Sequence, residues 1–218
     1  MRVATFNIHH GAGVDGVVDL DRTTAIVTGL GADLVALQEL DVGWPRSGRV
    51  DQPLELSERL GMTVHFWPTI RRHGGWYGLG VATADPLEAE AYPLPQLEDR
   101  EPRVAVVAHW RDLHVICVHL STKRGPRTAQ LAALGRIVAG LPGPRLLLGD
   151  LNASPFTLGP LRRGGLRRGP GWRSTMVRPP WRRIDHILAG GGLRVTRSGI
   201  VRSPASDHYA LWGDIQAH

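Results

Sequence analysis

The sequence predicts an α/β protein built on mixed β-sheets. Short apolar runs of strand length recur along the chain, for example Val3-Ala4-Thr5-Phe6 and Leu146-Leu147-Leu148. They alternate with fewer, longer segments that have the apolar spacing of helices. Some strand pairs follow one another without a helix between them, which indicates that the sheets contain antiparallel as well as parallel neighbours. The sequence has no heptads and no internal repeats.

The expected elements follow in order along the chain. We expect strands near residues 2–8, 33–38, 62–67, 77–83, 104–110, 113–119, 144–149, 184–189, 194–200 and 208–215. Helical patterns lie near residues 21–30, 52–60 and 126–140. Asp21 is the expected N-cap of the first helix, and Gly140, followed by Pro142, is expected to end the third. Residues 155–183 are rich in Gly, Pro, Arg and Trp, and we expect them to form an irregular surface excursion.

Composition is that of an ordinary globular protein. The chain has 218 residues, of which 42% are hydrophobic, and this suits a single domain over residues 1–218. Cys117 is the only cysteine, so an internal disulfide is excluded and a reducing compartment is favoured. No apolar stretch approaches the length of a transmembrane helix, and the chain opens directly on an expected strand. We therefore expect a cytoplasmic monomer, or a secreted one if a leader has been removed.

Small polar clusters stand at the ends of several expected strands. They comprise Asn7, Glu39, His119, Asp150 with Asn152, Asp185, and Asp207 with His208. A sheet holds the side chains at its strand ends rigidly. Carboxylate, amide and imidazole groups that converge on one rim suit a hard divalent cation and a phosphate group.

The segments that contain these residues resemble the endonuclease/exonuclease/phosphatase superfamily, which has the DNase I-like fold. In the family's order they are Thr5-Phe6-Asn7, Gln38-Glu39, Val118-His119, Gly149-Asp150-Leu151-Asn152, Ile184-Asp185-His186 and Ser206-Asp207-His208. Short patterns recur by chance, but this ordered set spans nearly the whole chain. The resemblance implies a four-layer α/β (α+β) sandwich, in which two packed mixed β-sheets are flanked by helices. It also implies a hydrolase that acts on phosphate esters.

The expected cofactor is Mg²⁺ or Mn²⁺. Glu39 matches the metal-binding glutamate of the family, and Asp207 and Asn7 are the expected further contributors. Mg²⁺ prefers oxygen ligands and takes only one or two carboxylates, which this set provides. His9 and His10, which follow Asn7, are more typical of loop residues than of ligands.

The resemblance assigns the catalytic roles to Asp150, Asn152, His208, Asp185 and His119. Asp150 and Asn152 lie two residues apart, so in extended backbone both side chains would point the same way. We expect the carboxylate to activate water and the amide to donate to a phosphoryl oxygen. Asp185 is expected to orient His208 and to favour its charged form.

His119 matches a histidine that an acidic residue supports in the nuclease branch of the family. The corresponding region here, residues 76–81, contains no acid. Phosphate binding is therefore the expected role of His119, rather than general-acid catalysis.

The candidate substrate-binding residues are Arg103, Lys123, Arg182 and Arg183. Arg103 is expected to contact the substrate or to brace Glu39. The two later arginines belong to an acid-free tract over residues 153–184 that carries eight arginines, although the net charge of the chain is only +6. This tract, with Trp172 and Trp181, suits a nucleic acid or an anionic lipid headgroup. A compositional explanation is equally good, because the chain has one lysine among 26 basic residues, as in proteins from GC-rich genomes.

The sequence thus predicts a phosphoesterase that hydrolyses a phosphodiester or phosphomonoester by direct attack of water. The substrate stays open between a nucleic acid, which would make the protein a nuclease, and lipid or inositol phosphates, which would make it a phosphatase or a sphingomyelinase-like phosphodiesterase. A catalytically inactive binding module is the alternative from another class. The complete set of site groups argues against it.

Overall fold

Two six-stranded β-sheets pack face to face in the computed structural model, which describes residues 1–97, 101–171 and 173–217. The first sheet has the order β11-β12-β1-β2-β4-β3. Its strands are β1 (Arg2–Asn7), β2 (Leu34–Val42), β3 (Thr63–Arg72), β4 (Gly75–Thr83), β11 (Leu193–Val201) and β12 (Ala210–Ala217). The second sheet has the order β5-β6-β7-β8-β10-β9. Its strands are β5 (Glu88–Pro93), β6 (Val104–Trp110), β7 (Leu113–His119), β8 (Arg145–Asp150), β9 (Arg167–Arg168) and β10 (Asp185–Gly190).

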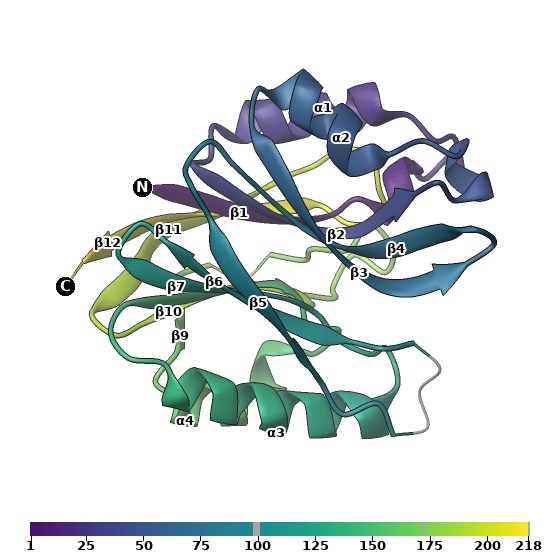
Figure 1. The fold of residues 1–218 in the computed structure, drawn as a ribbon. Helices are drawn as coiled ribbons and strands as arrows, with labels where there is room; N and C mark the ends of the chain where they lie inside the picture. The colour runs from purple at the N-terminus through teal and green to yellow at the C-terminus, as the bar shows by residue number, and fades with distance from the viewer. Residues whose placement is uncertain (98–100, 172, 218) are drawn as a thin grey trace.

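Helices cover the outer face of each sheet (Figure 1). The first sheet carries α1 (Leu20–Leu30) and α2 (Gln52–Leu60), and the second carries α3 (Arg124–Gly140) and the short α4 (Gly159–Arg163). Three short 3₁₀ turns lie in the loops: η1 (His9–Gly11), η2 (Pro45–Ser47) and η3 (Pro155–Thr157). This arrangement confirms the predicted four-layer sandwich. None of the helices in the described part of the chain is long and apolar enough to cross a membrane.

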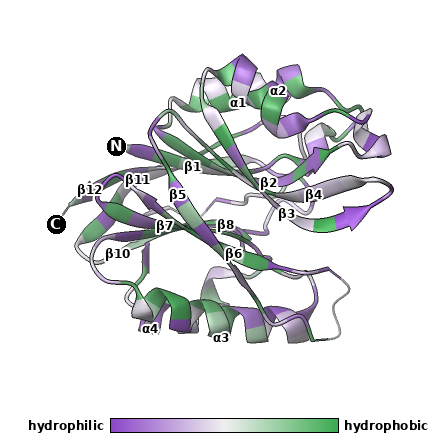
Figure 2. Cartoon of the chain, in the orientation of Figure 1, coloured by the Kyte–Doolittle hydropathy of each residue, from purple (hydrophilic) through white to green (hydrophobic). Residues whose placement is uncertain are grey.

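The central strands are apolar on both faces, because one face of each sheet packs against the other sheet and the opposite face packs against helices. In β7, Val115 and Cys117 enter the core between the sheets, whereas Ile116 and Val118 pack beneath α3. The leucines of β8 divide between the same two layers. Strand alternation therefore fills two cores from one hydrophobic run, and Figure 2 shows green stretches in the strands of both sheets, interrupted by purple residues.

The first helix begins earlier than predicted, and its N-cap is Asp19 rather than Asp21. The Asp19 carboxylate accepts hydrogen bonds from the backbone N–H groups of Asp21 and Arg22. The two aspartates flank Leu20, the first buried residue of α1, so the pattern alone did not distinguish them.

The edge strand β5 was not predicted. It pairs with β6 and carries glutamates at alternate positions, and of its residues only Ala89 is half-buried. An edge strand that buries so little and carries acidic residues has a weak apolar signal. The segment over residues 155–183 contains only η3, α4 and the two-residue β9 among its described residues, which agrees with the irregular excursion that was expected.

Candidate active site

The polar clusters at the strand ends meet at one edge of the sandwich. In the first sheet, Asn7 is the last residue of β1, and Glu39 lies within the neighbouring parallel strand β2, one residue beyond Gln38, which pairs with Asn7. In the second sheet, the parallel strands β7 and β8 end at His119 and Asp150, which are paired in register. Strand β10 runs antiparallel to β8, so its first residue, Asp185, lies opposite Asp150.

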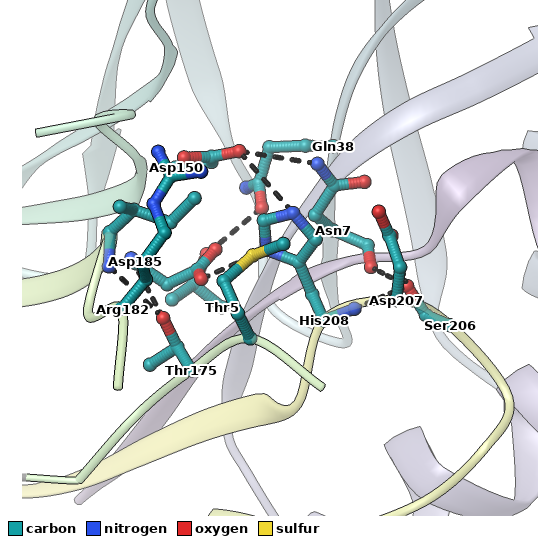
Figure 3. Close-up of polar contacts among 12 residues, drawn as sticks. Thr5, Asn7, Gln38, Asp150, Thr175, Arg182, Asp185, Ser206, Asp207 and His208 are labelled. Carbon is teal, nitrogen blue, oxygen red and sulfur yellow. Dashed lines mark hydrogen bonds and ion pairs between the residues drawn. The ribbon is translucent and has the colours of Figure 1, made fainter. Parts of the chain in front are cut away.

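Asp150 contacts side chains from both sheets, and Figure 3 draws its contacts with Asn7 and His208. Strand alternation directs it, together with Asn7 and His119, to the inner faces of the two sheets. Its Oδ2 accepts a hydrogen bond from Asn7 Nδ2 at 3.3 Å, and it lies 3.5 Å from His119 Nε2 and 3.8 Å from His208 Nε2. Nitrogen groups from both sheets thus surround a single buried carboxylate oxygen.

The environment of Asp150 favours proton uptake. Burial, reinforced by the negative charge of Asp185, raises the pKa of Asp150 to about 7, although the nearby His208 opposes this shift. The other carboxylate oxygen, Oδ1, accepts a hydrogen bond from the backbone N–H of Asn152 at 2.8 Å. A fixed carboxyl group with a pKa near neutrality is suited to taking a proton from water.

His208 and Asp185 form the pair that the sequence predicted. His208 Nδ1 lies 2.9 Å from Asp185 Oδ2, and both side chains are buried. Burial alone would lower the pKa of His208, but the carboxylate of Asp185, with smaller contributions from Asp150 and Asp207, raises it to about 10. The imidazolium therefore donates Nδ1–H to Asp185 and presents Nε2–H to the centre of the site.

Asn152 does not have the extended backbone that was expected. Its φ is 47°, in the left-handed region, where asparagine is tolerated better than most residues. Its Nδ2 donates to the Leu120 carbonyl at 3.0 Å. The amide is therefore held by the loop after β7 instead of lying parallel to the Asp150 side chain.

Glu39 lies inside β2, at a β-bulge, and not after the strand. The register of β2 against β4 shifts between Gln38 and Leu40, and Glu39 has a φ of 66°. Regular alternation would have turned Glu39 towards the helices, on the side where Leu37 packs. The bulge re-aims it, and its Oε1 accepts a hydrogen bond from Asn7 Nδ2 at 2.8 Å.

Glu39 offers a carboxylate of the kind that holds a divalent cation. Asp207 adds a half-exposed carboxylate on the loop before β12. Asn7 turns its amide nitrogen, and not its oxygen, towards Glu39 and Asp150, while its Oδ1 accepts from the backbone N–H of His9 at 3.0 Å. This orientation favours a positioning role for Asn7 over the direct ligation that was expected.

A second group of potential ligands consists of Asp150, Asp185 and His208, whose ligand atoms lie within 4.8 Å of one another. A hydrogen bond already joins Asp185 to His208 Nδ1, and the charge of this imidazolium compensates the buried carboxylates. This arrangement suits proton transfer and phosphate contact better than metal binding.

Tyr77 is a partner of His119 that the sequence analysis missed. Its hydroxyl lies 3.4 Å from His119 Nδ1. Burial raises the pKa of Tyr77 well above its usual range, so the phenol stays protonated and donates a hydrogen bond to Nδ1. Burial, with the positive charges of Arg103 and His208, lowers the pKa of His119 well below its usual range. The neutral ring thus carries its proton on Nε2. Residues 76–81 contain no acid, but a phenol can also fix an imidazole tautomer.

A hollow of about 290 Å³ beside Glu39 is lined by Arg46 and Arg103, among other residues. Arg103, which was expected to contact the substrate or to brace Glu39, is only 6% exposed and forms an ion pair with Glu101. Arg46 is held by the fully buried carboxylate of Asp41. Guanidinium groups that are already fixed lose little entropy when they bind a phosphate.

A larger groove of about 700 Å³ opens next to Asn152. Arg124 and Arg127 from α3 line it together with Arg182 and Arg183, and we call it the basic groove. Burial and then the charges of Arg182 and Arg124 lower the pKa of Arg127, so these side chains repel one another. A surface of this kind attracts an anion.

The structure divides the arginine tract that the sequence presented as a unit. Arg167 donates to the backbone carbonyls of residues 162 and 166, outside the lining of the basic groove. Lys123 is exposed and directly precedes α3. Trp181, which is 74% exposed, lines the groove, and Trp172 lies outside the described residues.

The model of the endonuclease/exonuclease/phosphatase family matches residues 4–208. The chain belongs to this family. Members of the family are hydrolases that act on phosphoester bonds and generally use divalent metals. A comparison with curated proteins gave no match.

Solved structures of this family have the same fold. An endonuclease/exonuclease/phosphatase from Beutenbergia cavernae is 25% identical, with a TM-score of 0.82 over 100% of this chain and 71% of that one. A mannosyl-6-phosphatase from Bacteroides thetaiotaomicron is 16% identical, with a TM-score of 0.72 over 99% of both chains. The catalytic domain of human Nocturnin, with a bound sulfate anion, is 20% identical, with a TM-score of 0.71 over 100% of this chain and 94% of that one.

Proposed function

We propose that this chain is a divalent-metal-dependent phosphoesterase that cleaves its substrate by direct attack of water on phosphorus. The observation that supports this most is the convergence of Asn7, His119 and His208 on Oδ2 of Asp150. Hydrolysis without a covalent intermediate requires a base for the water and donors for the charge that develops on the phosphoryl oxygens. A binding module would gain nothing from a buried carboxyl group with a raised pKa.

Asp150 is the proposed base. It orients the attacking water and takes up its proton, while Asn7 and the backbone N–H of Asn152 keep the carboxylate in place. The imidazolium of His208 and the neutral Nε2–H of His119 donate to the phosphoryl oxygens as their charge grows. Asp185 keeps His208 charged and oriented throughout the reaction.

Glu39 and Asp207 would hold the cation. When bound, Mg²⁺ or Mn²⁺ polarises a phosphoryl oxygen and neutralises charge on the leaving oxygen. Asn7 orients Glu39 and Asp150 with respect to each other, because its Nδ2 donates to both carboxylates.

Metal removal tests this function. Hydrolysis of bis(p-nitrophenyl) phosphate by the full chain should stop in excess EDTA and return when Mg²⁺ or Mn²⁺ is added. The Asp150→Asn variant, purified in parallel, controls for a contaminating esterase. Undiminished activity in excess chelator would contradict the proposal.

The basic groove favours a nucleic acid as the substrate. Four arginines line it beside Asn152, and the exposed Trp181 offers a surface on which a base can stack. Anionic lipid headgroups and inositol phosphates are the alternative substrates. A screen of DNA, RNA and headgroup esters with Mg²⁺ and with Mn²⁺ separates these classes.

A further inference from the structure

His9, His10 and Glu39 form a cluster beside the buried centre of the site. Each offers one ligand atom, and the three atoms lie within 4.8 Å of one another. The two imidazole rings are in edge contact, with centroids 4.5 Å apart, and Asp207 Oδ1 lies 4.0 Å from His9 Nδ1. Two imidazoles with a carboxylate form a ligand set typical of first-row transition metals.

All three members of the cluster have a backbone conformation that L-residues rarely adopt. Their φ angles are 47° for His9, 46° for His10 and 66° for Glu39. Local hydrogen bonds hold the two histidines in this conformation, from Ala12 N to His9 O and from Gln52 Nε2 to His10 O, both at 2.8 Å. Strained residues of this kind accumulate at functional sites, where the surrounding structure maintains them.

The surroundings of the ring nitrogens are compatible with metal ligation. His9 Nδ1 lies 3.3 Å from the Ala12 carbonyl, and a proton on Nδ1 leaves the Nε2 lone pair available. Histidine ligands usually donate their other N–H to such a carbonyl. His10 Nδ1 is buried and has no hydrogen-bond partner among the described residues. A buried polar atom without a partner is costly unless something binds it.

We propose that His9 and His10 join Glu39 as ligands of the cation and that they select Mn²⁺, or another first-row transition ion, over Mg²⁺. This inference rests on the proposed placement of the cation at Glu39. Mg²⁺ binds oxygen and keeps its waters, whereas imidazole nitrogen adds affinity for transition ions. The purified protein would therefore carry a transition ion even where Mg²⁺ is more abundant.

Calorimetric titration of the metal-free full chain with Mn²⁺ and with Mg²⁺ tests the selectivity. Mn²⁺ should bind at least about tenfold more tightly than Mg²⁺, because only Mn²⁺ gains from the imidazole ligands. A double variant with His9→Asn and His10→Asn should lose about 10- to 100-fold in Mn²⁺ affinity and stay within about threefold in Mg²⁺ affinity. Asparagine is the replacement of choice because it tolerates the left-handed backbone.

The matched control removes another pair of neighbouring imidazoles. His109 on β6 and His114 on β7 have ring centroids 5.8 Å apart, so His109→Asn with His114→Asn should leave both metal affinities unchanged. An NMR titration of the wild-type protein gives a second test, which does not depend on the folding of a variant. On addition of Zn²⁺, the imidazole ¹⁵N resonances of His9 and His10 should shift, and those of His109 and His114 should not.

The inference is overturned if the double variant binds Mn²⁺ like the wild type, if it loses affinity for both metals equally, or if the His9 and His10 resonances do not respond to Zn²⁺. Different results would contradict the proposed function. Glu39→Gln should abolish both metal binding and hydrolysis, so this result supports the cation site even where the histidines prove not to be ligands. If hydrolysis persists in excess chelator although the His9 and His10 resonances respond to Zn²⁺, only the proposed function is contradicted.

Discussion

At the scale of single residues, Asp150 is subject to opposing requirements. Catalysis needs a carboxyl group in a dry, preorganised position, but the fold must then bury a charge. The structure meets this with His208 and Asn7, and still leaves the pKa of Asp150 raised to about 7, with burial as the main cause. Residues of this kind commonly reduce stability while they serve activity.

Asp150→Asn should therefore change activity and stability in opposite directions. The amide cannot take a proton, so kcat for the small diester should fall by about three orders of magnitude or more. The charged form of Asp150 is disfavoured in the fold, so its cost is absent below the unfolded pKa and complete above the folded one. In chelator, the variant should thus gain about 1–3 kcal/mol in free energy of unfolding at pH 8 and little at pH 4. Urea unfolding at the two pH values, with kcat measured at pH 8, checks both statements, and a variant less stable than the wild type at pH 8 would refute the second.

Tyr77 and His119 should behave as one functional unit. Tyr77→Phe removes the donor that keeps the His119 proton on Nε2, so we expect kcat to fall about tenfold. His119→Ala should lower kcat by about 10²- to 10³-fold, less than His208→Ala, because His119 is neutral. In the double variant, the loss should equal that of His119→Ala alone, since the phenol acts only through the ring. Additive losses would mean that Tyr77 contacts the substrate itself.

At the scale of elements, strand alternation accounts for much of the site. Alternate residues of a strand share a face, so the core residues of β1, β7 and β8 place Asn7, His119 and Asp150 on the inner faces of the sheets. This placement can be derived from the sequence alone. The alternation fails at Glu39, because a β-bulge inserts one residue, and at Asn152, because its backbone is left-handed. Neither feature has a glycine to signal it. Those positions were recognised through the family resemblance and not from local pattern.

Gly149, just before Asp150, should be intolerant of any side chain. Its φ of 146° is unfavourable for L-residues, and a Cβ there would overlap the backbone of Val118 on β7. Gly149→Ala should cost about 2–4 kcal/mol in free energy of unfolding, because β8 must move away from β7. The matched control is Gly29→Ala at an exposed position of α1, where a Cβ meets no atom within 4 Å and where we expect a gain of about 0.5–1 kcal/mol. Denaturant unfolding measures the free energy of unfolding of both variants. Equal values would show that β7 and β8 accommodate the added Cβ without loss of stability.

At the scale of the whole molecule, the layers followed from the sequence better than the surface did. Long apolar runs and three helical patterns sufficed for a mixed α/β fold, and the ordered motifs added the second sheet. The arginine tract was different. Sequence proximity suggested one patch, but the chain folds so that only Arg182 and Arg183 of the tract line the basic groove, where they meet Arg124 and Arg127 from α3. Charges far apart in sequence become neighbours only through tertiary structure.

This regrouping separates a substrate-binding surface from a compositional bias. Replacing Arg124, Arg127 and Arg182 with Gln should raise KM for DNA or RNA and leave kcat/KM for the small diester within about twofold, because a small diester does not extend into the groove. Fewer phosphate contacts release fewer counterions, so the slope of log KM against log salt should flatten by about 2–3. The control variant carries Gln at Arg163, Arg167 and Arg173, which loses the same net charge outside the groove lining and should keep the wild-type slope. Equal salt slopes in the two triple variants would mean that the groove arginines act only through the overall charge of the protein and do not contact the substrate. A wild-type slope near zero would contradict a polyanionic substrate.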